Sequence, residues 1–222
     1  MRFVQNPSDL GSPDAVILPG TKSTIADLLW LTESGFSEKI IALAEQGTHV
    51  VGVCGGYQML GTAVFDPNHV ESEHPSAQGL SLLPVETTFV GDKATHQMRG
   101  TIQATGGWLA ELNGQSLTGY EIHMGRTETD SAWLQVEQRG ESAVSILDGA
   151  ISKNQKIWGC YIHGLFGNEN LRRAWLAQLG HVSSTRDSEA DLIMASIDRL
   201  ADSVEKNLQL DKYLNVAQTA LQ

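Results

Sequence analysis

The chain has 222 residues, of which 41% are hydrophobic and 18% charged, a balance that excludes an intrinsically disordered protein. Acidic residues number 26 against 15 Lys and Arg, and the net charge of −11 argues against a nucleic-acid-binding protein, because phosphate contacts require clustered basic side chains. Since only Cys54 and Cys160 are cysteines and no apolar run could span a bilayer, we expect one domain over residues 1–222 in a reducing cytoplasm, without membrane partners.

The first part of the chain alternates apolar runs with helical segments. Residues 1–4 are expected to form a short strand, and the apolar run 14–18 suits a strand buried on both faces of a parallel sheet. Helices are expected over 25–31 and from Ser37, its N-cap, to about Gly47. A further strand then ends at Cys54. This alternation predicts right-handed βαβ crossovers and an α/β fold with a mostly parallel sheet.

The rest of the chain changes character and then returns to the buried-strand pattern. Residues 66–75 are polar and predict a surface loop, and several strand-like segments after them predict an antiparallel extension of the sheet. A buried strand is expected over 156–162, directly before His163. The segment of about 188–214 is amphipathic, and we expect it to pack on the domain as a helix. The remaining expected elements are strands over 85–89, 97–102, 119–126 and 143–147 and a helix over 170–179.

Cys54 stands where a strand gives way abruptly to a helix, with Gly52 and Gly56 on either side. This is the G-x-nucleophile-x-G pattern of a nucleophile elbow, whose strained turn requires flanking residues without side chains. A thiol at that position lies over a helix amino terminus, where positive partial charge favours a thiolate. The competing interpretation is a buried structural cysteine, which is common in cores.

A cysteine nucleophile needs a base, and His163 follows a second predicted core strand. Because parallel strands end at the same edge of a sheet, both groups are expected to meet there, although a histidine that only caps a strand would look the same. The N–H of Gly55 is one expected donor for an oxyanion, and the loop containing Gly20 and Thr21 is expected to supply another. The Cys160–His163 spacing lacks a second ligand pair, so no metal site is expected.

Five stretches, in this order, resemble the carboxy-terminal class I glutamine amidotransferase domain of the cobyric acid synthase family. They are residues 18–24 (LPGTKST), 52–61 (GVCGGYQMLG), 79–87 (GLSLLPVET), 119–125 (GYEIHMG) and 161–166 (YIHGLF). The resemblance covers nearly the whole chain and implies the flavodoxin-like class I amidotransferase fold.

The resemblance also implies a reaction. Cys54 would attack the side-chain amide of L-glutamine, release ammonia and form a glutamyl thioester that water hydrolyses, with His163 as the family's catalytic histidine. Gln58 matches the glutamine of the C-x-G-x-Q pattern, which helps to bind substrate. Tyr120, Glu121, His123 and Arg126 lie in or beside the GYEIH segment and are expected to bind substrate too; Arg126 in particular would pair with the α-carboxylate.

No cofactor is expected in this domain itself. The resemblance implies a fused, ATP- and Mg²⁺-dependent synthetase domain that uses the ammonia to amidate corrin-ring carboxylates in cobalamin biosynthesis. In the family, that domain and an initial glutaminase strand precede the segment resembling residues 2–4, so the chain resembles an amino-terminally truncated fragment. His163 also lacks the carboxylate of the usual H-x-E pattern, which indicates a catalytic dyad and leaves open whether Glu86, Glu121 or Glu169 orients it.

Three alternatives accompany this interpretation. The glutaminase subunit that amidates the peptidoglycan precursor lipid II has similar motifs, but the amino-acid sequences of residues 84–87 (PVET) and 121–124 (EIHM) favour the corrin enzyme. A cysteine hydrolase of the same general fold would need no synthetase. A non-catalytic truncated domain would serve only as a binding surface.

Overall fold

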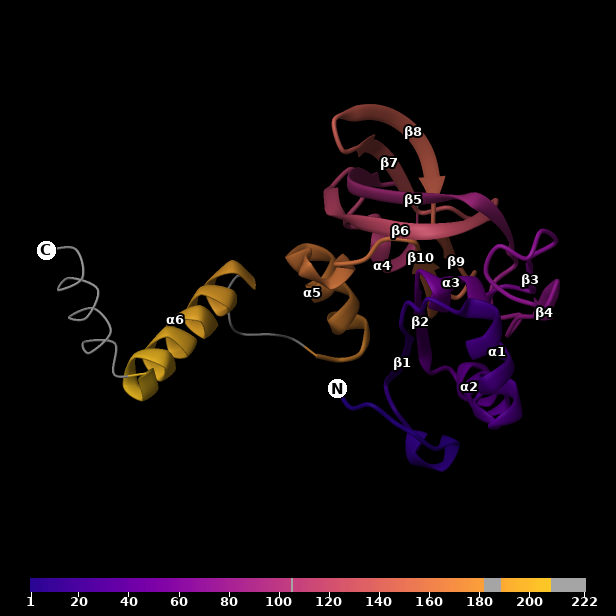
Figure 1. Cartoon of the computed structure of the whole chain (residues 1–222), viewed down its shortest axis with the longest axis horizontal. Helices are drawn as coiled ribbons and strands as arrows, with labels where there is room; N and C mark the ends of the chain where they lie inside the picture. The colour runs from indigo at the N-terminus through magenta and orange to yellow at the C-terminus, as the bar shows by residue number, and fades with distance from the viewer. Residues whose placement is uncertain (105, 182–188, 209–222) are drawn as a thin grey trace, which may run out of the picture. The chain divides into compact units, whose positions relative to one another are not determined.

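The computed structural model describes residues 1–104, 106–181 and 189–208 (Figure 1). These fall into two compact units, residues 1–181 and residues 182–222. Within its described part, the second unit consists of the helix α6 (Glu189–Leu208). All sheets and the expected site residues belong to the first unit.

The first unit is built on a largely parallel sheet in the order β1-β2-β10-β9. Strands β1 (Ala15–Leu18) and β10 (Ile157–Cys160) both run parallel to the central strand β2 (His49–Val53), and β9 (Ala150–Ile151) is antiparallel to β10. Consequently β1, β2 and β10 all end at one edge of the sheet. The loops that leave those three ends carry Gly20, Cys54 and His163.

Helices and loops cover both faces of this sheet. The helices of the first unit are α1 (Thr24–Glu33), α2 (Phe36–Glu45), α3 (Gly55–Leu60), α4 (Gly107–Ala110) and α5 (Glu169–Gln178), with single 3₁₀ turns at Pro7–Leu10 and Leu165–Gly167. Val50 packs into one buried cluster with residues of α1 and α2, whereas its neighbour Val51 packs into another with Trp158 and Trp175. Successive side chains of a strand point to opposite faces of the sheet, so Val50 and Val51 pack into different clusters because both faces of β2 are buried.

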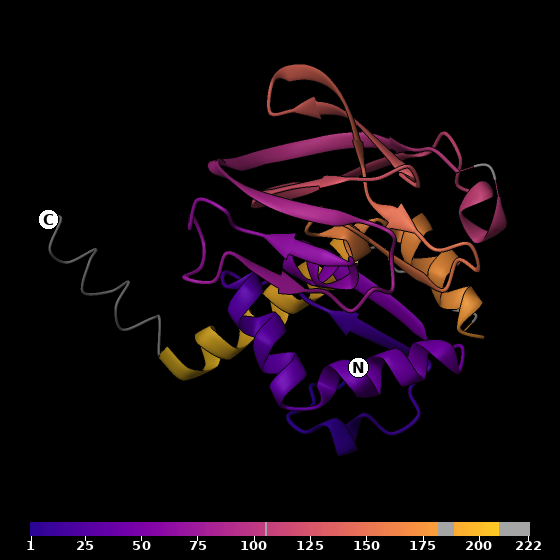
Figure 2. The same ribbon diagram turned by 90° about the vertical axis from the view of Figure 1, so that its right-hand side faces the viewer.

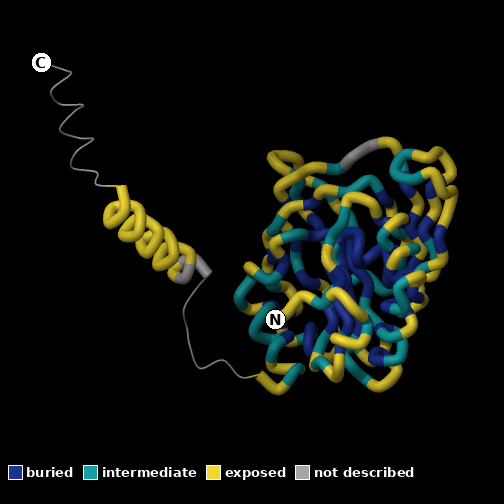
Figure 3. Tube along the Cα trace, turned by 60° about the horizontal axis from the view of Figure 1, so that its bottom comes forward, coloured by how far each residue is buried: buried dark blue, intermediate teal, exposed yellow. Residues whose placement is uncertain are grey.

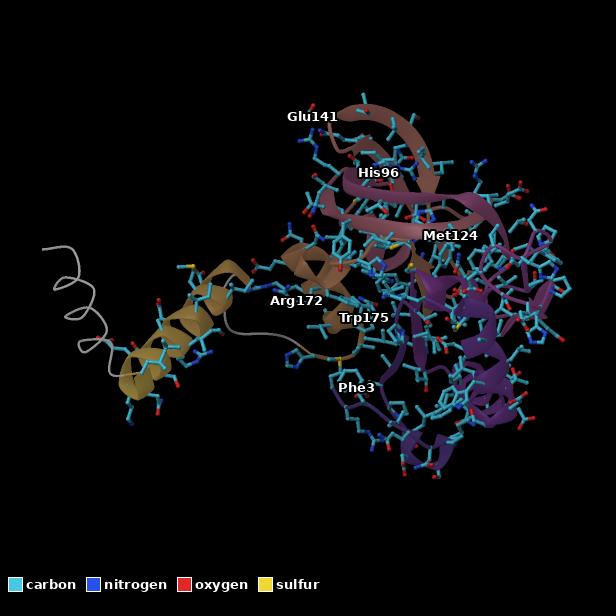
Figure 4. All side chains as sticks on the ribbon, in the orientation of Figure 1. Phe3, His96, Met124, Glu141, Arg172 and Trp175 are labelled. Carbon is cyan, nitrogen blue, oxygen red and sulfur yellow. The ribbon has the colours of Figure 1, made fainter. Side chains whose placement is uncertain are left out.

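The core of the first unit lies around the parallel sheet, as the buried segments at its centre show (Figure 3). On the α5 side, Trp175 points toward β10 and meets Trp158 edge to face, with ring centroids 5.8 Å apart (Figure 4). Edge-to-face rings add favourable electrostatics to the burial of a large apolar area.

The remaining strands form a second, mostly antiparallel sheet, in which β3 runs parallel to β5. Its long strands lie on the opposite side of the parallel sheet from α1 and α2 (Figure 2). Its order is β4-β3-β5-β7-β8, and β6 pairs with β5. The strands are β3 (Ala63–Phe65), β4 (Ser76–Gln78), β5 (Glu86–Ile102), β6 (Ser116–Glu128), β7 (Leu134–Arg139) and β8 (Ser142–Asp148). An isolated antiparallel bridge between Tyr120 and His163 joins this sheet to the end of β10.

The α/β class with a parallel sheet is confirmed, and three local expectations are wrong. Residues 1–4 are not a strand, because no described strand pairs with them; instead Arg2 donates to the carbonyl of Leu10 at 2.9 Å. Ser37 does not cap α2, since Gly35 takes the N-cap in a left-handed conformation (φ 81°) and Ser37 is buried inside the helix. The strands expected over 85–147 belong to a second sheet, and the antiparallel extension of the parallel sheet is instead the short strand β9.

The expected carboxy-terminal helix is described only in part. Helix α6 covers Glu189–Leu208, while residues 188 and 209–214 of the expected segment lie outside the described residues. Its packing on the rest of the domain stays a prediction. Across the described part of the chain, no helix combines the length and the hydrophobicity needed to cross a membrane.

Candidate active site

The turn at Cys54 has the geometry of a nucleophile elbow. Cys54 adopts φ 53° and ψ −112°, a strained conformation for a residue with a side chain. Its flanking glycines are needed for close packing. A Cβ on Gly56 would lie 2.1 Å from the carbonyl oxygen of Leu18, and one on Gly52 would lie 2.6 Å from the amide of Tyr57. The G-x-C-x-G pattern is therefore explained by backbone contacts.

The thiol of Cys54 is buried, with 4% of the residue exposed, and it donates to the carbonyl oxygen of Ile122 at 3.4 Å. Burial raises the pKa of this thiol to about 11; the N–H of Gly55 acts against the rise, and the charge of Asp148 adds to it. At neutral pH the resting group is therefore a thiol, and an attack on substrate requires a base that takes its proton.

His163 lies just beyond the end of β10 and is held on one side by Tyr120. The two residues exchange backbone hydrogen bonds of 2.8 and 3.2 Å, and their rings stack with centroids 5.1 Å apart at 10°. Burial lowers the pKa of the His163 imidazole, and the charge of His123 lowers it further. At neutral pH this imidazole is neutral, which is the state in which it can accept a proton.

The three strand ends meet at Gly20. A Cβ on this glycine would lie 2.8 Å from Cε1 of His163 and 3.3 Å from Cβ of Cys54, so both side chains contact its backbone. The next residue, Thr21, lies against Gly55: a Cβ there would be 3.1 Å from the amide nitrogen of Thr21. The backbone of Gly20 thus contacts Cys54 and that of Thr21 packs on Gly55, while the role of these amides as an oxyanion hole stays a prediction.

Gln58, expected to bind substrate, lies buried in α3, and described residues engage both ends of its amide. Its Oε1 accepts a hydrogen bond from the hydroxyl of Thr24 at 3.0 Å, and its Nε2 donates to the hydroxyl of Tyr161 at 3.2 Å. The amide thus links α3 to the start of α1 and to the loop before His163. Its contact with substrate stays a prediction.

The expected binding residues on β6 are divided between two faces of the strand. Tyr120 and Ile122 are exposed by 41% and 39%. The ring of Tyr120 stacks on His163, and the contact of Ile122 with Cys54 is made by its backbone carbonyl. Glu121 and His123 lie on the other face. His123 contacts Oε2 of Glu121 at 3.0 Å and stacks on Tyr161 with centroids 3.8 Å apart.

Glu121 is the centre of this buried polar network. It is 2% exposed and forms an ion pair with Arg139, whose terminal nitrogen donates at 2.8 Å. Burial alone would raise the pKa of Glu121, but the hydrogen bonds from His123 and Arg139 outweigh it and hold the pKa below its usual value. Arg126 is exposed and makes no hydrogen bond or ion pair with described residues.

A cavity of about 320 Å³ lies on the Glu121 side of β6, and Glu121, His123, Arg126 and Arg139 contribute to its lining. Asp148 also lines it and accepts the backbone N–H of Tyr161 at 3.1 Å and that of Gly149 at 2.6 Å. Burial raises the pKa of Asp148 to about 6, against the lowering effect of these two bonds. These residues thus form a second polar group on the other face of β6, and the charges of Asp148 and His123 still act on Cys54 and His163.

Among the described residues, His163 makes no hydrogen bond or ion pair with a carboxylate. Each of the three candidates has another partner: Glu86 accepts from Thr62, Glu121 is held by Arg139, and Glu169 pairs with Arg173 at 2.8 Å. The geometry is therefore that of two side chains, Cys54 and His163, with neighbouring backbone amides.

The sequence interpretation missed three acidic residues that organise the surroundings of the site. Asp148 fixes the loop before His163, Asp66 holds the backbone of Glu71, and Glu71 fixes the start of α1. The dipeptide Asp66-Pro67 is a recognisable turn signal, so the role of Asp66 was partly accessible. No local pattern marks Glu71, because its partners lie more than 40 residues earlier in the chain.

Comparison with known proteins places this geometry in a family context. Residues 1–171 match the family of CobB/CobQ-like glutamine amidotransferase domains. The chain is 42% identical over 216 residues to the cobyric acid synthase of Dehalococcoides mccartyi, which covers 96% of this chain and 43% of that protein. It is 46% identical over 181 residues to the cobyric acid synthase of Moorella thermoacetica, covering 81% and 35%. The chain thus spans less than half the length of these relatives.

Among solved structures, the one described as the structure of PurLQS from Thermotoga maritima superposes with a TM-score of 0.52 at 14% identity. The match covers 75% of this chain and 79% of that one. At this identity, the likeness bears on the fold alone.

Proposed function

Because the chain belongs to the family of CobB/CobQ-like glutamine amidotransferase domains, we propose that it hydrolyses glutamine through a Cys54–His163 dyad. The observation that carries the proposal is the meeting of three parallel strand ends at Gly20, with the strained Cys54 on one side and His163 on the other. Glutamine amidotransferases are the class of enzyme in which such a thiol releases ammonia from a side-chain amide.

In the first half-reaction, Sγ of Cys54 attacks the side-chain amide carbon of glutamine while the neutral imidazole of His163 takes the thiol proton. The amides of Gly55 and of the Gly20–Thr21 loop stabilise the oxygen that becomes negative. The carbon–nitrogen bond then breaks, His163 returns the proton to the leaving nitrogen, and ammonia departs from a glutamyl thioester.

In the second half-reaction, water attacks the thioester carbon as His163 accepts one of its protons. The carbon–sulfur bond breaks, the proton returns to Sγ, and glutamate is released with the thiol restored. The raised pKa of Cys54 suits this cycle, because the thiol is protonated at its start and at its end.

The test is glutamate release from glutamine by the full chain and by Cys54→Ala. We expect the variant to lose at least about 10³-fold in rate, since it removes the nucleophile. Cys160→Ala is the matched control, because Cys160 is also buried but takes no part in the mechanism, and it should stay within about threefold. An electrophilic diazoketone analogue of glutamine should alkylate Sγ of Cys54 with loss of N₂, so the wild type and Cys160→Ala, but not Cys54→Ala, should gain the mass of the analogue less N₂. Unchanged hydrolysis by Cys54→Ala would contradict the dyad.

We further propose that the ammonia serves an ATP-dependent synthetase in a longer protein, as the relatives named cobyric acid synthase suggest, and that corrin-ring carboxylates are its acceptors. A full-length enzyme carrying this chain should amidate such carboxylates with ATP, Mg²⁺ and glutamine. Its Cys54→Ala variant should lose glutamine-dependent amidation but keep amidation by added ammonia. Amidation of lipid II and not of a corrin would overturn this assignment.

A further inference from the structure

The amino terminus of helix α1 is capped by the side chain of Glu71, which is distant in sequence. Ser23 occupies the N-cap but makes no capping hydrogen bond with its side chain. The carboxylate of Glu71 takes that role: it accepts the N–H of Thr24 through one oxygen and the N–H of Ile25 through the other, the latter at 3.4 Å. A carboxylate at a helix amino terminus satisfies free N–H groups and complements the helix dipole.

Glu71 can reach this position because Asp66 shapes the loop that carries it. Asp66 is fully buried, and its carboxylate accepts the backbone N–H groups of Val70, Glu71 and Ser72 at 2.8 to 2.9 Å. Burial works to raise the pKa of Asp66, but these three bonds outweigh it and keep the pKa below its usual value. The backbone of Glu71 is therefore held by an ionised anchor.

Thr24, the first residue of α1, contacts both Glu71 and helix α3. Thr24 gives its N–H to Glu71 and its hydroxyl to Gln58, which belongs to α3, the helix that starts at Gly55. Three residues before Thr24, the backbone of Thr21 packs against Gly55. Thr24 therefore holds the end of the Gly20–Thr21 loop through two hydrogen bonds, one to Glu71 and one to Gln58.

We propose that Glu71 is a positioning residue for the oxyanion hole. By holding the amide of Thr24, it sets the distance between the Gly20–Thr21 amides and the amide of Gly55. It acts through the loop and does not contact the reacting atoms. This inference rests on the proposed glutaminase function.

The experiment compares Glu71→Ala and Glu71→Gln with Glu73→Ala in the full chain. Glu73 lies two residues further along the same loop, is exposed and makes no hydrogen bond or ion pair with described residues, so it is a matched control. We expect Glu71→Ala to lower the kcat of glutamine hydrolysis by about 10- to 100-fold with little change in KM, which is less than the loss of a whole oxyanion donor. Glu71→Gln, which keeps one acceptor, should lie between Glu71→Ala and the wild type.

A second readout separates this role from a general effect on the site. Alkylation of Cys54 by iodoacetamide at about pH 9 needs the thiolate but forms no oxyanion, so its rate should stay within about twofold in both Glu71 variants. Parallel losses of alkylation and hydrolysis, or an unchanged kcat in Glu71→Ala, would overturn the inference. If Cys54→Ala hydrolyses glutamine as well as the wild type, the proposed function itself fails. If only Cys54→Ala is inactive and Glu71→Ala is normal, the inference alone fails.

Discussion

The two faces of strand β6 show how one short motif carries two kinds of residue. On one face, the ring of Tyr120 stacks on His163, and between the faces the backbone carbonyl of Ile122 accepts the thiol of Cys54. On the other face, Glu121 and His123 form a buried network with Arg139. Neighbours in a strand point in opposite directions, so residues adjacent in the GYEIH motif face different surroundings. We therefore expect the first face to control the rate of the reaction and the second to control stability.

The largest expected contrast is between the two histidines. His163→Asn removes the proposed base and should lower the rate of glutamine hydrolysis by roughly 10²- to 10⁴-fold. His123→Asn keeps a polar group beside Glu121 and should change the rate by less than about threefold, while costing about 1 kcal/mol of stability through the weakened hydrogen bond. Steady-state kinetics and urea unfolding of both variants measure the contrast. Equal loss of activity in the two would remove the distinction between the faces.

The next effect is on stability alone. Glu121→Ala leaves the guanidinium of Arg139 and the imidazole of His123 without their buried partner. Because Arg139 retains some access to water, we expect a loss of roughly 2 to 4 kcal/mol rather than the full cost of an uncompensated buried charge. The free energy of unfolding in urea gives this value. Folded Glu121→Ala with a normal unfolding free energy would show that the network contributes little.

The contribution of Asp148 to the free energy of unfolding should depend on pH. Burial raises the pKa of Asp148 from 3.8 to about 6, so the native state binds this proton more tightly than the unfolded chain does. The resulting stabilisation is complete below pH 3.8 and is lost as the pH rises through about 6. The unfolding free energy of the wild type minus that of Asp148→Asn should therefore fall by up to about 3 kcal/mol between these values.

Glu121 supplies the control with the opposite sign. Its pKa lies below its usual value of 4.5, so the stability that it contributes is present above that pH and is lost as the pH falls. The same difference measured for Glu121→Gln should therefore rise with pH. Slopes of the same sign for both variants would contradict the assignment of the two carboxylates.

The smallest effect belongs to the ring that faces His163. Tyr120→Ala removes the stacked partner of the imidazole and should lower kcat by about 2- to 10-fold, the scale expected for one aromatic contact. Tyr120→Phe keeps the ring and should remain within about twofold, since no described residue bonds the Tyr120 hydroxyl. A loss in Tyr120→Phe equal to that in Tyr120→Ala would indicate that the hydroxyl, not the stack, matters.

The meeting of Gly20, Cys54 and His163 could be predicted from the sequence, because each follows an apolar run and parallel strands end at a common edge. The elbow glycines were equally accessible, since the G-x-C-x-G pattern has a steric cause that a Cβ on Gly56 makes plain. These predictions depend on short-range patterns and on one rule of topology. They needed no knowledge of side-chain partners.

The partners of Glu121 and Glu71 could not be predicted in this way. Glu121 pairs with Arg139 on β7, a strand that the sequence interpretation did not anticipate, and Glu71 caps a helix that begins 47 residues before it. Such contacts are set by how distant segments pack, and a charged residue in a loop has the same appearance whether it is solvated or buried. The sequence of β6 likewise did not show which of its side chains lie on the exposed face and which on the buried face.

Backbone packing around Cys54 fixes the position of residue 54, so this position does not depend on which side chain the residue carries. The strand before it, the Gly52–Tyr57 contact and the Gly56–Leu18 contact fix residue 54 without help from its sulfur. Cys54→Ser should therefore present an oxygen at the same place, with a proton far harder to remove than that of a thiol. Such a variant would hold intact glutamine in the assembled site, which makes the substrate complex a state that can be isolated and described.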